Sequence, residues 1–201
     1  MSFYKITMNK VSYGLKVNTD FTESEIKKNT RVININKKEH VQIHEEKFKN
    51  DFLSHYVINL NAEGASVEFI GRYKANNSLV DVSCEVNHNA DNTKSLINIR
   101  GIAEAKGKII SRTNIYVKEG VRGVEGEEKC KYIFVSPSLG GVGEVGGEID
   151  ALPALDINSH EVRVSHAVSI YKIKKSDIWY AGLHSFSQKE AEKIFKESFL
   201  N

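Results

Sequence analysis

Short apolar or alternating stretches follow one another along the middle of the chain, each bounded by glycine, asparagine or aspartate. Stretches of about five residues at intervals of roughly ten to twenty predict short β-strands joined by turns. No helix-period segment of about ten residues separates them, which disfavours a βαβ sheet and favours a sandwich, a barrel or a stacked β-solenoid. The predicted strands are Val57–Leu60, Ala65–Ile70, Leu79–Val86, Ser95–Ile99, Lys108–Val117, Lys131–Val135, Leu155–Ile157 and Val162–Val168.

The two ends of the chain have different patterns. Arg31–Asn36 alternates as a strand does, and Glu23–Lys28 fits either one helical turn or a solvated loop. Near the other end, Ser176 can cap a first turn, and Ser187 with Glu190 forms a capping box that opens a helix.

The predicted C-terminal helix has one apolar stripe. Such a stripe needs a cover, which is either the chain's own β domain or a partner. Together the patterns predict a β core over residues 1–175, with the weakest pattern in the first 60, and a helical segment over residues 176–201. The stripe consists of Ala191, Ile194, Phe195 and Phe199.

The composition fits a soluble globular protein. Of 201 residues, 40% are hydrophobic, and 28 basic against 26 acidic side chains leave a net charge of +2, with no run of five like charges. This balance disfavours nucleic-acid binding, and no apolar run approaches the ~18 residues of a membrane span. The first ten residues lack the apolar stretch of a signal peptide, so we expect a cytoplasmic protein with Cys84 and Cys130 reduced. Two cysteines cannot supply the four thiolates of an all-cysteine zinc or iron–sulfur site.

Motifs for nucleotide binding and nucleophilic catalysis are missing from the sequence. Residues 141–146, GVGEVG, fit G-x-G-x-x-G, but no helix follows to face a pyrophosphate, which favours a glycine-rich β-turn. No G-x-x-x-x-G-K-[ST] or G-x-S-x-G sequence occurs, so any ATP hydrolysis belongs to another subunit. Glu125, Glu127 and Glu128 are expected on a solvated loop between strands rather than in a catalytic carboxylate pair.

Two histidines stand in or beside predicted strands. His88 lies in the sequence VNHNA and His166 in VSHAV. A neutral imidazole at such a position is either a hydrogen-bonded core residue or a ligand of a soft metal. The residues alone leave both interpretations open.

Several segments, in order and at compatible spacing, carry a family resemblance over about two thirds of the chain. Residues 63–73 read EGASVEFIGRY, and residues 80–95 contain a D…H…T-x-S run made by Asp81, His88, Thr93 and Ser95. Residues 147–157 read GEIDALPALDI, residues 161–166 read EVRVSH, and the DIWY sequence at 177–180 precedes the C-terminal helix. These segments resemble the SufB/SufD family, the scaffold proteins of the Suf iron–sulfur cluster assembly machinery.

The resemblance implies an all-β fold, a right-handed parallel β-helix with a short C-terminal helical tail. It also implies a non-enzymatic scaffold subunit that pairs side by side with another β-helix, either a SufB-like chain or a second identical subunit. Docking of a SufC-like ABC ATPase on the C-terminal helices is implied as well. On this basis the partner-binding residues are Ile178, Trp179, Tyr180, Phe195 and Phe199.

By the same resemblance, an iron–sulfur cluster is assembled transiently at the subunit interface. His166 matches the histidine that faces this interface in the SufD branch, and it is the candidate metal ligand. Cys84 and Cys130 are either further ligands or buried, inert thiols.

The sequence departs from the family pattern at the proposed site. The position of the SufB cysteine falls on Gly147, and the acids that flank the SufB histidine are replaced by Ser165 and Ala167. By this comparison we expect a chain nearer to SufD, in a short form, or a reduced archaeal-type homologue. Two alternatives stay open: a degenerate scaffold without cluster chemistry, and a carbohydrate-active β-helix enzyme with a groove of acids and aromatics.

Overall fold

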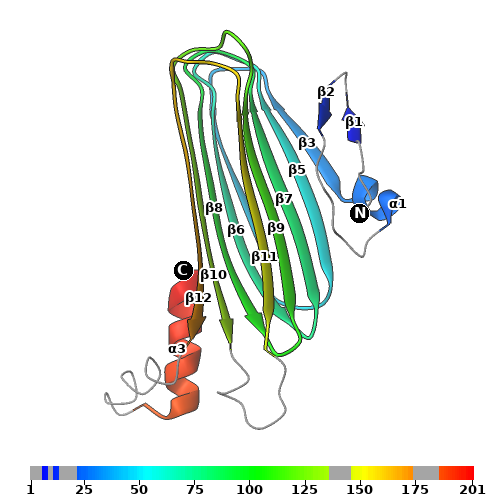
Figure 1. Cartoon of the computed structure of the whole chain (residues 1–201), viewed down its shortest axis with the longest axis vertical. Coiled ribbons are helices and arrows are strands. Elements are labelled where there is room, and N and C mark those ends of the chain that lie inside the picture. The colour runs from blue at the N-terminus through cyan, green and yellow to red at the C-terminus, as the bar shows by residue number, and fades with distance from the viewer. Residues whose placement is uncertain (1–5, 9–10, 14–21, 136–145, 174–185) are drawn as a thin grey trace.

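The computed structural model describes residues 6–8, 11–13, 22–135, 146–173 and 186–201. Within these ranges the chain consists mainly of parallel β-strands that wind into a β-solenoid, which confirms the predicted all-β solenoid architecture (Figure 1). The strands are β1 (Ile6–Met8), β2 (Val11–Tyr13), β3 (Thr30–Ile35), β4 (His40–Lys47), β5 (Phe52–Leu60), β6 (Ser66–Asn76), β7 (Leu79–His88), β8 (Lys94–Glu104), β9 (Lys108–Val117), β10 (Val124–Val135), β11 (Glu148–Ile157) and β12 (Val162–Ile173), and the helices are α1 (Glu23–Lys28) and α3 (Gln188–Leu200).

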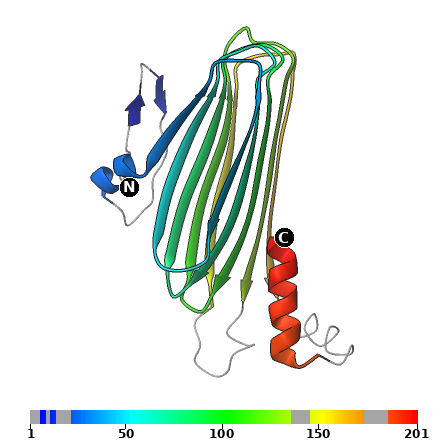
Figure 2. The same cartoon turned by 180° about the vertical axis from the view of Figure 1, so that it is seen from behind.

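Two five-stranded parallel sheets form the walls of the solenoid. One sheet has the strand order β12-β10-β8-β6-β4 and the other the order β11-β9-β7-β5-β3. Consecutive strands alternate between the sheets, so that each pair forms one rung stacked on the preceding rung (Figures 1 and 2). At the start of the solenoid, α1 adopts the helical alternative for its segment, because Thr22 and Glu25 form a capping box.

Apolar side chains stack in rows between the two sheets. Ile58, Val86 and Ile115 occupy one register position on β5, β7 and β9, and all three are fully buried. Burial of each such side chain stabilises the fold by roughly 1.5–3 kcal/mol. A rung buries its apolar edge only against its neighbours, so the core is one continuous ladder rather than a separate centre for each strand.

Strand β9 has the predicted bounds Lys108–Val117, but most strands are longer than predicted, since β4 to β12 each span 8–12 residues. Glycines read as turn signals lie inside strands. A Cβ atom on Gly71 in β6 would lie 2.6 Å from the ring of Tyr73, and one on Gly101 in β8 would lie 2.8 Å from the ring of Tyr132. These glycines make room for buried aromatic rings.

Asparagine ladders cross the second sheet at the C-terminal ends of β3, β5 and β7. Asn59 Nδ2 donates to Asn34 Oδ1 at 2.8 Å, and Asn87 Nδ2 donates to Asn59 Oδ1 at 3.0 Å. A second ladder joins Asn36, Asn61 and Asn89 at 2.9 Å per bond. The middle amide of each ladder donates to one neighbour and accepts from the other, which holds β3, β5 and β7 in register.

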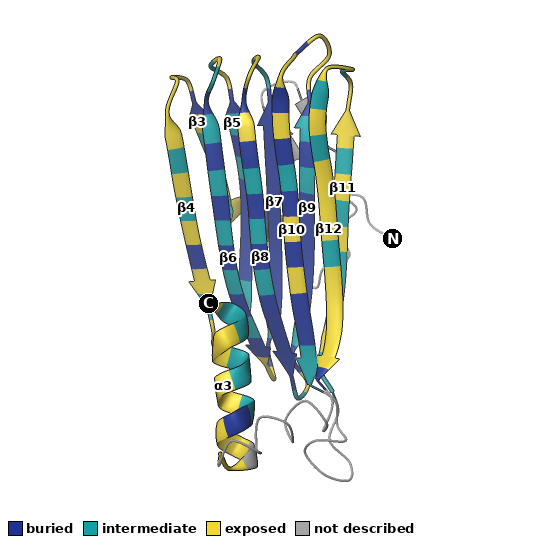
Figure 3. Cartoon of the chain, turned by 90° about the vertical axis from the view of Figure 1, so that its left-hand side faces the viewer, coloured by how far each residue is buried: buried dark blue, intermediate teal, exposed yellow. Residues whose placement is uncertain are grey.

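Helix α3 packs on the outer face of the β12-containing sheet (Figures 1 and 3). Its residues Ala191, Phe195, Phe199 and Leu200 cover Ile102, Ile133, Val135 and Ile173. The apolar stripe of the helix is therefore covered, at least in part, by the chain's own β domain.

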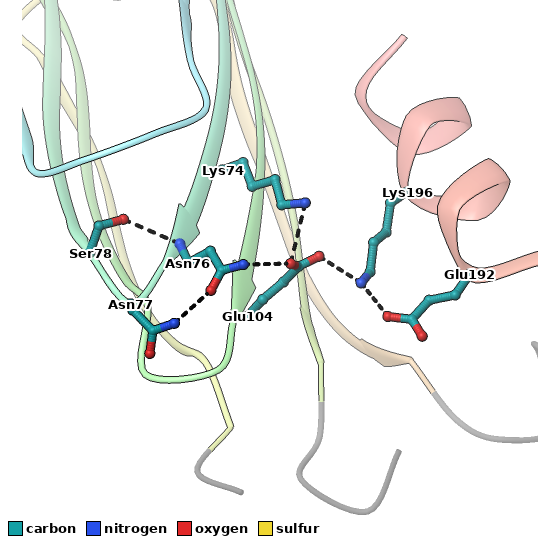
Figure 4. Close-up of polar contacts among 7 residues, drawn as sticks. All are labelled: Lys74, Asn76, Asn77, Ser78, Glu104, Glu192 and Lys196. Carbon is teal, nitrogen blue, oxygen red and sulfur yellow. Dashed lines mark hydrogen bonds and ion pairs between the residues drawn. The ribbon is translucent and has the colours of Figure 1, made fainter. Parts of the chain in front are cut away.

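Ionic contacts fix the same helix to the sheet (Figure 4). Glu104, at the end of β8, forms ion pairs with Lys196 Nζ at 2.6 Å and with Lys74 Nζ at 3.2 Å. Lys196 also pairs with Glu192 on the helix itself. Arg100 Nη1 donates to the Phe199 carbonyl oxygen at 2.8 Å and so satisfies one carbonyl in the last turn of the helix.

Candidate functional site

The end of the solenoid formed by β11 and β12 is open. Among the described strands, these two are the last in their sheets, and each is paired on one side only. Their residues are mostly exposed or half-buried, whereas those of the middle strands β5 to β10 are mostly buried (Figure 3). Leu152, Ile157, Ile170 and Tyr171 are 39–48% exposed. Apolar side chains and a free strand edge together make this rung suitable for pairing with another chain.

His166 lies in the middle of this last rung. The side chains of Val162, Val164 and Val168 pack against the core, and strand residues alternate between faces, so His166 shares their inward face. It is nevertheless exposed, since no described strand stacks beyond β12. The candidate metal ligand is thus at an accessible position.

The register partner of His166 is Glu128 on β10. Glu128 is fully buried, which corrects its predicted position on a solvated loop; the alternation of Val124, Gly126, Glu128 and Cys130 sets its inward direction. Thr113 Oγ1 donates to Glu128 Oε2 at 3.0 Å, and Oε1 has no hydrogen-bond partner. Burial raises the pKa of this carboxyl to about 7, partly opposed by the Thr113 bond.

Glu125 and Glu127 do not share this environment, although they too lie on β10. Glu125 pairs with Lys94 at 2.8 Å and Glu127 with Lys129 at 2.7 Å, and all four side chains are about half-exposed. Both glutamates line a shallow groove of about 550 Å³ on the outer face of the sheet. Only Glu128 of the three predicted acids belongs to the interior.

Both cysteines are free and buried in the core. Burial raises the pKa of the Cys84 thiol well above its ordinary value and that of Cys130 to about 11. The thiolate is the form that binds metal, and both sites disfavour it. This environment agrees with the interpretation as inert core thiols.

His88 is a hydrogen-bonded core residue, the structural alternative of the two offered by the sequence. It is fully buried at the end of β7, with Nδ1 at 2.8 Å from Thr93 Oγ1 and Nε2 at 2.8 Å from Ser95 Oγ. Burial lowers the pKa of its imidazole to about 4. The hydrogen bonds of His88 with Thr93 and Ser95, the H…T-x-S part of the family pattern, therefore stabilise the turn between β7 and β8.

The aspartate of the same pattern also has a structural partner. Asp81 on β7 and Arg112 on β9 form an ion pair of 2.5 Å, with side-chain exposures of 0% and 2%. Removal of either partner leaves a buried unpaired charge, which is strongly destabilising. No sequence motif points to Arg112, because its pairing with Asp81 depends on the stacking of two rungs.

At Gly147, the position that matches the SufB cysteine, the backbone leaves no room for a side chain. A Cβ atom there would lie 2.3 Å from the Ala103 carbonyl oxygen. Glu148 N donates to Gly107 O, and Gly107 makes the same close approach to Ala75 O one rung earlier. The close backbone contact at this corner of the solenoid therefore leaves no space for a cysteine side chain at position 147.

The described residues place only some of the predicted partner-binding groups. Phe195 and Phe199 are half-buried against the β domain, while Ile194 on α3 is 46% exposed. Ile178, Trp179 and Tyr180 lie outside the described residues, as do residues 141–145 of the glycine-rich segment.

No three His, Cys, Asp or Glu side chains converge as a metal site within the described parts of the chain. His166 and Glu128 therefore supply at most two ligands, and further ones have to come from elsewhere. Neither α1 nor α3 is long and apolar enough to cross a membrane, and these are the helices of the described residues.

Comparison with known proteins found a matching family model and several relatives. Residues 14–199 match the family model described as "SUF system FeS cluster assembly, SufBD core domain". Iron–sulfur cluster assembly SufBD family proteins of Mycobacterium bovis, Mycobacterium tuberculosis and Mycobacterium leprae are each 22% identical over 120 residues. The match covers 60% of this chain and 13% of each relative, so the chain spans a small part of the curated relatives' length. Since the family model covers most of the chain, this protein belongs to the SufBD family of iron–sulfur cluster assembly proteins.

Proposed function

We propose that this chain is a non-enzymatic scaffold subunit of iron–sulfur cluster assembly, acting in the cytoplasm. The single observation that supports it best is the SufBD core-domain match over residues 14–199, on a solenoid whose open last rung carries His166. Iron and sulfide are the cargo of such a subunit, held transiently where two chains meet. The carbohydrate-active alternative has no comparable support.

The open rung is the proposed surface for pairing with another β-helix, either a SufB-like chain or a second copy. Strand β12 offers twelve residues of unpaired edge, and β11 offers ten. A strand from the partner satisfies these backbone groups, and the apolar residues Ile170 and Tyr171 add contact area. His166 then lies beside the partner, which supplies the ligands that this chain lacks.

The C-terminal segment is the proposed docking element for a SufC-like ABC ATPase. Phe195 and Phe199 anchor α3 to the β domain, so their contribution to docking is to hold the helix in position. Ile194 and the charged residues beside it remain on the exposed side of α3. Ile178, Trp179 and Tyr180 are proposed to contribute the larger apolar contact.

Anaerobic co-expression with an ABC-type ATPase and a SufB-like chain tests this proposal. We expect a stable complex on size-exclusion chromatography that contains iron and sulfide. His166→Ala should retain the complex and lose most of the bound iron, while His160→Ala, at an exposed residue outside the strands, serves as the matched control. If no complex forms, the scaffold function is wrong; if His166→Ala binds as much iron as the wild type, the role of His166 is wrong.

A second candidate function is a degenerate scaffold that docks partners but has lost cluster chemistry. The close approach of Gly147 to Ala103 favours it, because a thiolate cannot be accommodated there. In the same experiment this candidate predicts a stable ATPase complex without iron or sulfide.

A further inference from the structure

A buried carboxylate and an exposed imidazole occupy one register position on neighbouring strands at the open end of the solenoid. Glu128 on β10 is paired with His166 on β12, and both face inward. Neighbouring strands lie about 4.8 Å apart, so side chains at paired positions are in reach of one another. Two side-chain atoms that bind one metal ion each lie about 2.1 Å from the metal, so they lie roughly 3 Å from one another.

One oxygen of Glu128 is available for a ligand. Oε2 is held by Thr113, whereas Oε1 is buried and has no partner within the described residues. Burial without a hydrogen-bond partner is unfavourable for a carboxylate oxygen, which is a strong reason for it to bind a proton, a water molecule or a cation. Threonine fixes the other oxygen, so the carboxylate is oriented before a ligand arrives.

We propose that Glu128 and His166 together bind one divalent cation of the ferrous type at the open end of the solenoid. Imidazole and carboxylate are suitable ligands for Fe²⁺ and for its spectroscopic substitute Co²⁺. Two donors from this chain leave the other coordination positions for water, sulfide or a partner's side chains. The inference deepens the proposed scaffold function by adding Glu128 as a ligand, and it rests on that function only for the identity of the metal.

The chain contains a matched control for Glu128. Glu127 is the next residue on the same strand, but its side chain points outward and pairs with Lys129 at 2.7 Å. Glu127→Gln therefore removes the same charge from the same strand without touching the proposed site. His160→Ala is the corresponding control for His166, since both imidazoles are exposed.

The test is anaerobic titration of the purified full chain with Co²⁺, followed by its visible absorption and by calorimetry. We expect one equivalent to bind to the wild type and to both controls. Glu128→Gln and His166→Ala should each weaken binding by about tenfold or more. Because His166 is exposed, its variant folds whether or not Glu128→Gln does, and circular dichroism checks both.

The proposal is overturned if the wild type binds no Co²⁺ or if Glu128→Gln and His166→Ala bind as tightly as the controls. In that case Oε1 is satisfied by water or by a proton. This outcome is separate from failure of the scaffold function. A chain that binds Co²⁺ but forms no ATPase complex would support the cation site and contradict the scaffold function. A chain that forms the ATPase complex but binds no Co²⁺ would support the scaffold function and contradict the cation site.

Discussion

The buried state of His88 predicts that this residue destabilises the protein in acid. Its imidazole has an ordinary pKa of 6.5, lowered to about 4 in the fold because burial disfavours the charged form. The unfolded chain therefore binds a proton between these values and the folded chain does not. The contribution of neutral His88 is present above pH 6.5 and is lost as the pH falls to about 4. The full difference is about 3 kcal/mol, of which about 2 kcal/mol is lost at pH 5.

The assay is urea unfolding of the wild type and of His88→Gln between pH 4.5 and 8. The comparison is needed because Glu85 and Glu128, whose pKa values burial raises to about 7, act in the opposite direction. They bind protons in the folded state, so their contribution to stability grows as the pH falls below 7. These terms are common to both proteins and cancel in the difference.

We expect the free energy of unfolding of the wild type to fall by about 2 kcal/mol relative to His88→Gln between pH 8 and pH 5. The same substitution at the exposed His160 measures the effect of removing one imidazole from the surface. Parallel pH curves for the wild type and His88→Gln would refute the reasoning, since the imidazole would then titrate with the same pKa in the folded and the unfolded chain.

Three further predictions concern the corner at Gly147 and the anchoring of α3. Gly147→Cys should lower the free energy of unfolding by about 1–3 kcal/mol in urea titrations, because its Cβ meets the Ala103 carbonyl oxygen; unchanged stability would mean that the corner can open. Phe195→Ala should speed amide exchange throughout α3, while Ile194→Ala, on the exposed side, should not; equal effects would contradict the packing of the helix. Glu104→Gln removes the carboxylate that pairs with Lys196 and should lower the free energy of unfolding by about 1–3 kcal/mol at low salt. A thermal melt that matches the wild type would show that this ion pair contributes little to stability.

Some site residues could be predicted from the sequence and others could not. His166 follows from its motif, and its role as a metal ligand stays a prediction; the structure shows that it is exposed. The sequence predicts a loop for Glu128, which is wrong, because three glutamates between Gly123 and Lys129 resemble a solvated turn. The inward spacing of Glu128, Cys130 and Tyr132 was the available signal. Its pairing with His166 is a contact between residues 38 positions apart, which only the register of two rungs creates.

Local patterns in the sequence are enough to predict an all-β fold. Short apolar strands without intervening helices favour a sandwich, a barrel or a solenoid, and the family resemblance selects the solenoid. The capping box at Ser187 predicts the start of α3 correctly. These features are local, since a turn residue, a cap or an alternating pattern acts within a few positions of itself.

The direction of each side chain along the long strands, and the residues beside it, depend on how the rungs stack. In the sequence, Gly101 indicates a turn; in the structure, it lies inside a strand and makes room for the ring of Tyr132. The stripe of α3 has the same pattern whether it meets the chain's own sheet or a partner, and the Glu104–Lys196 pair joins elements far apart in sequence. Register between rungs is a long-range property, and it places Glu128 beside His166, on the neighbouring strand, at the open end of the solenoid.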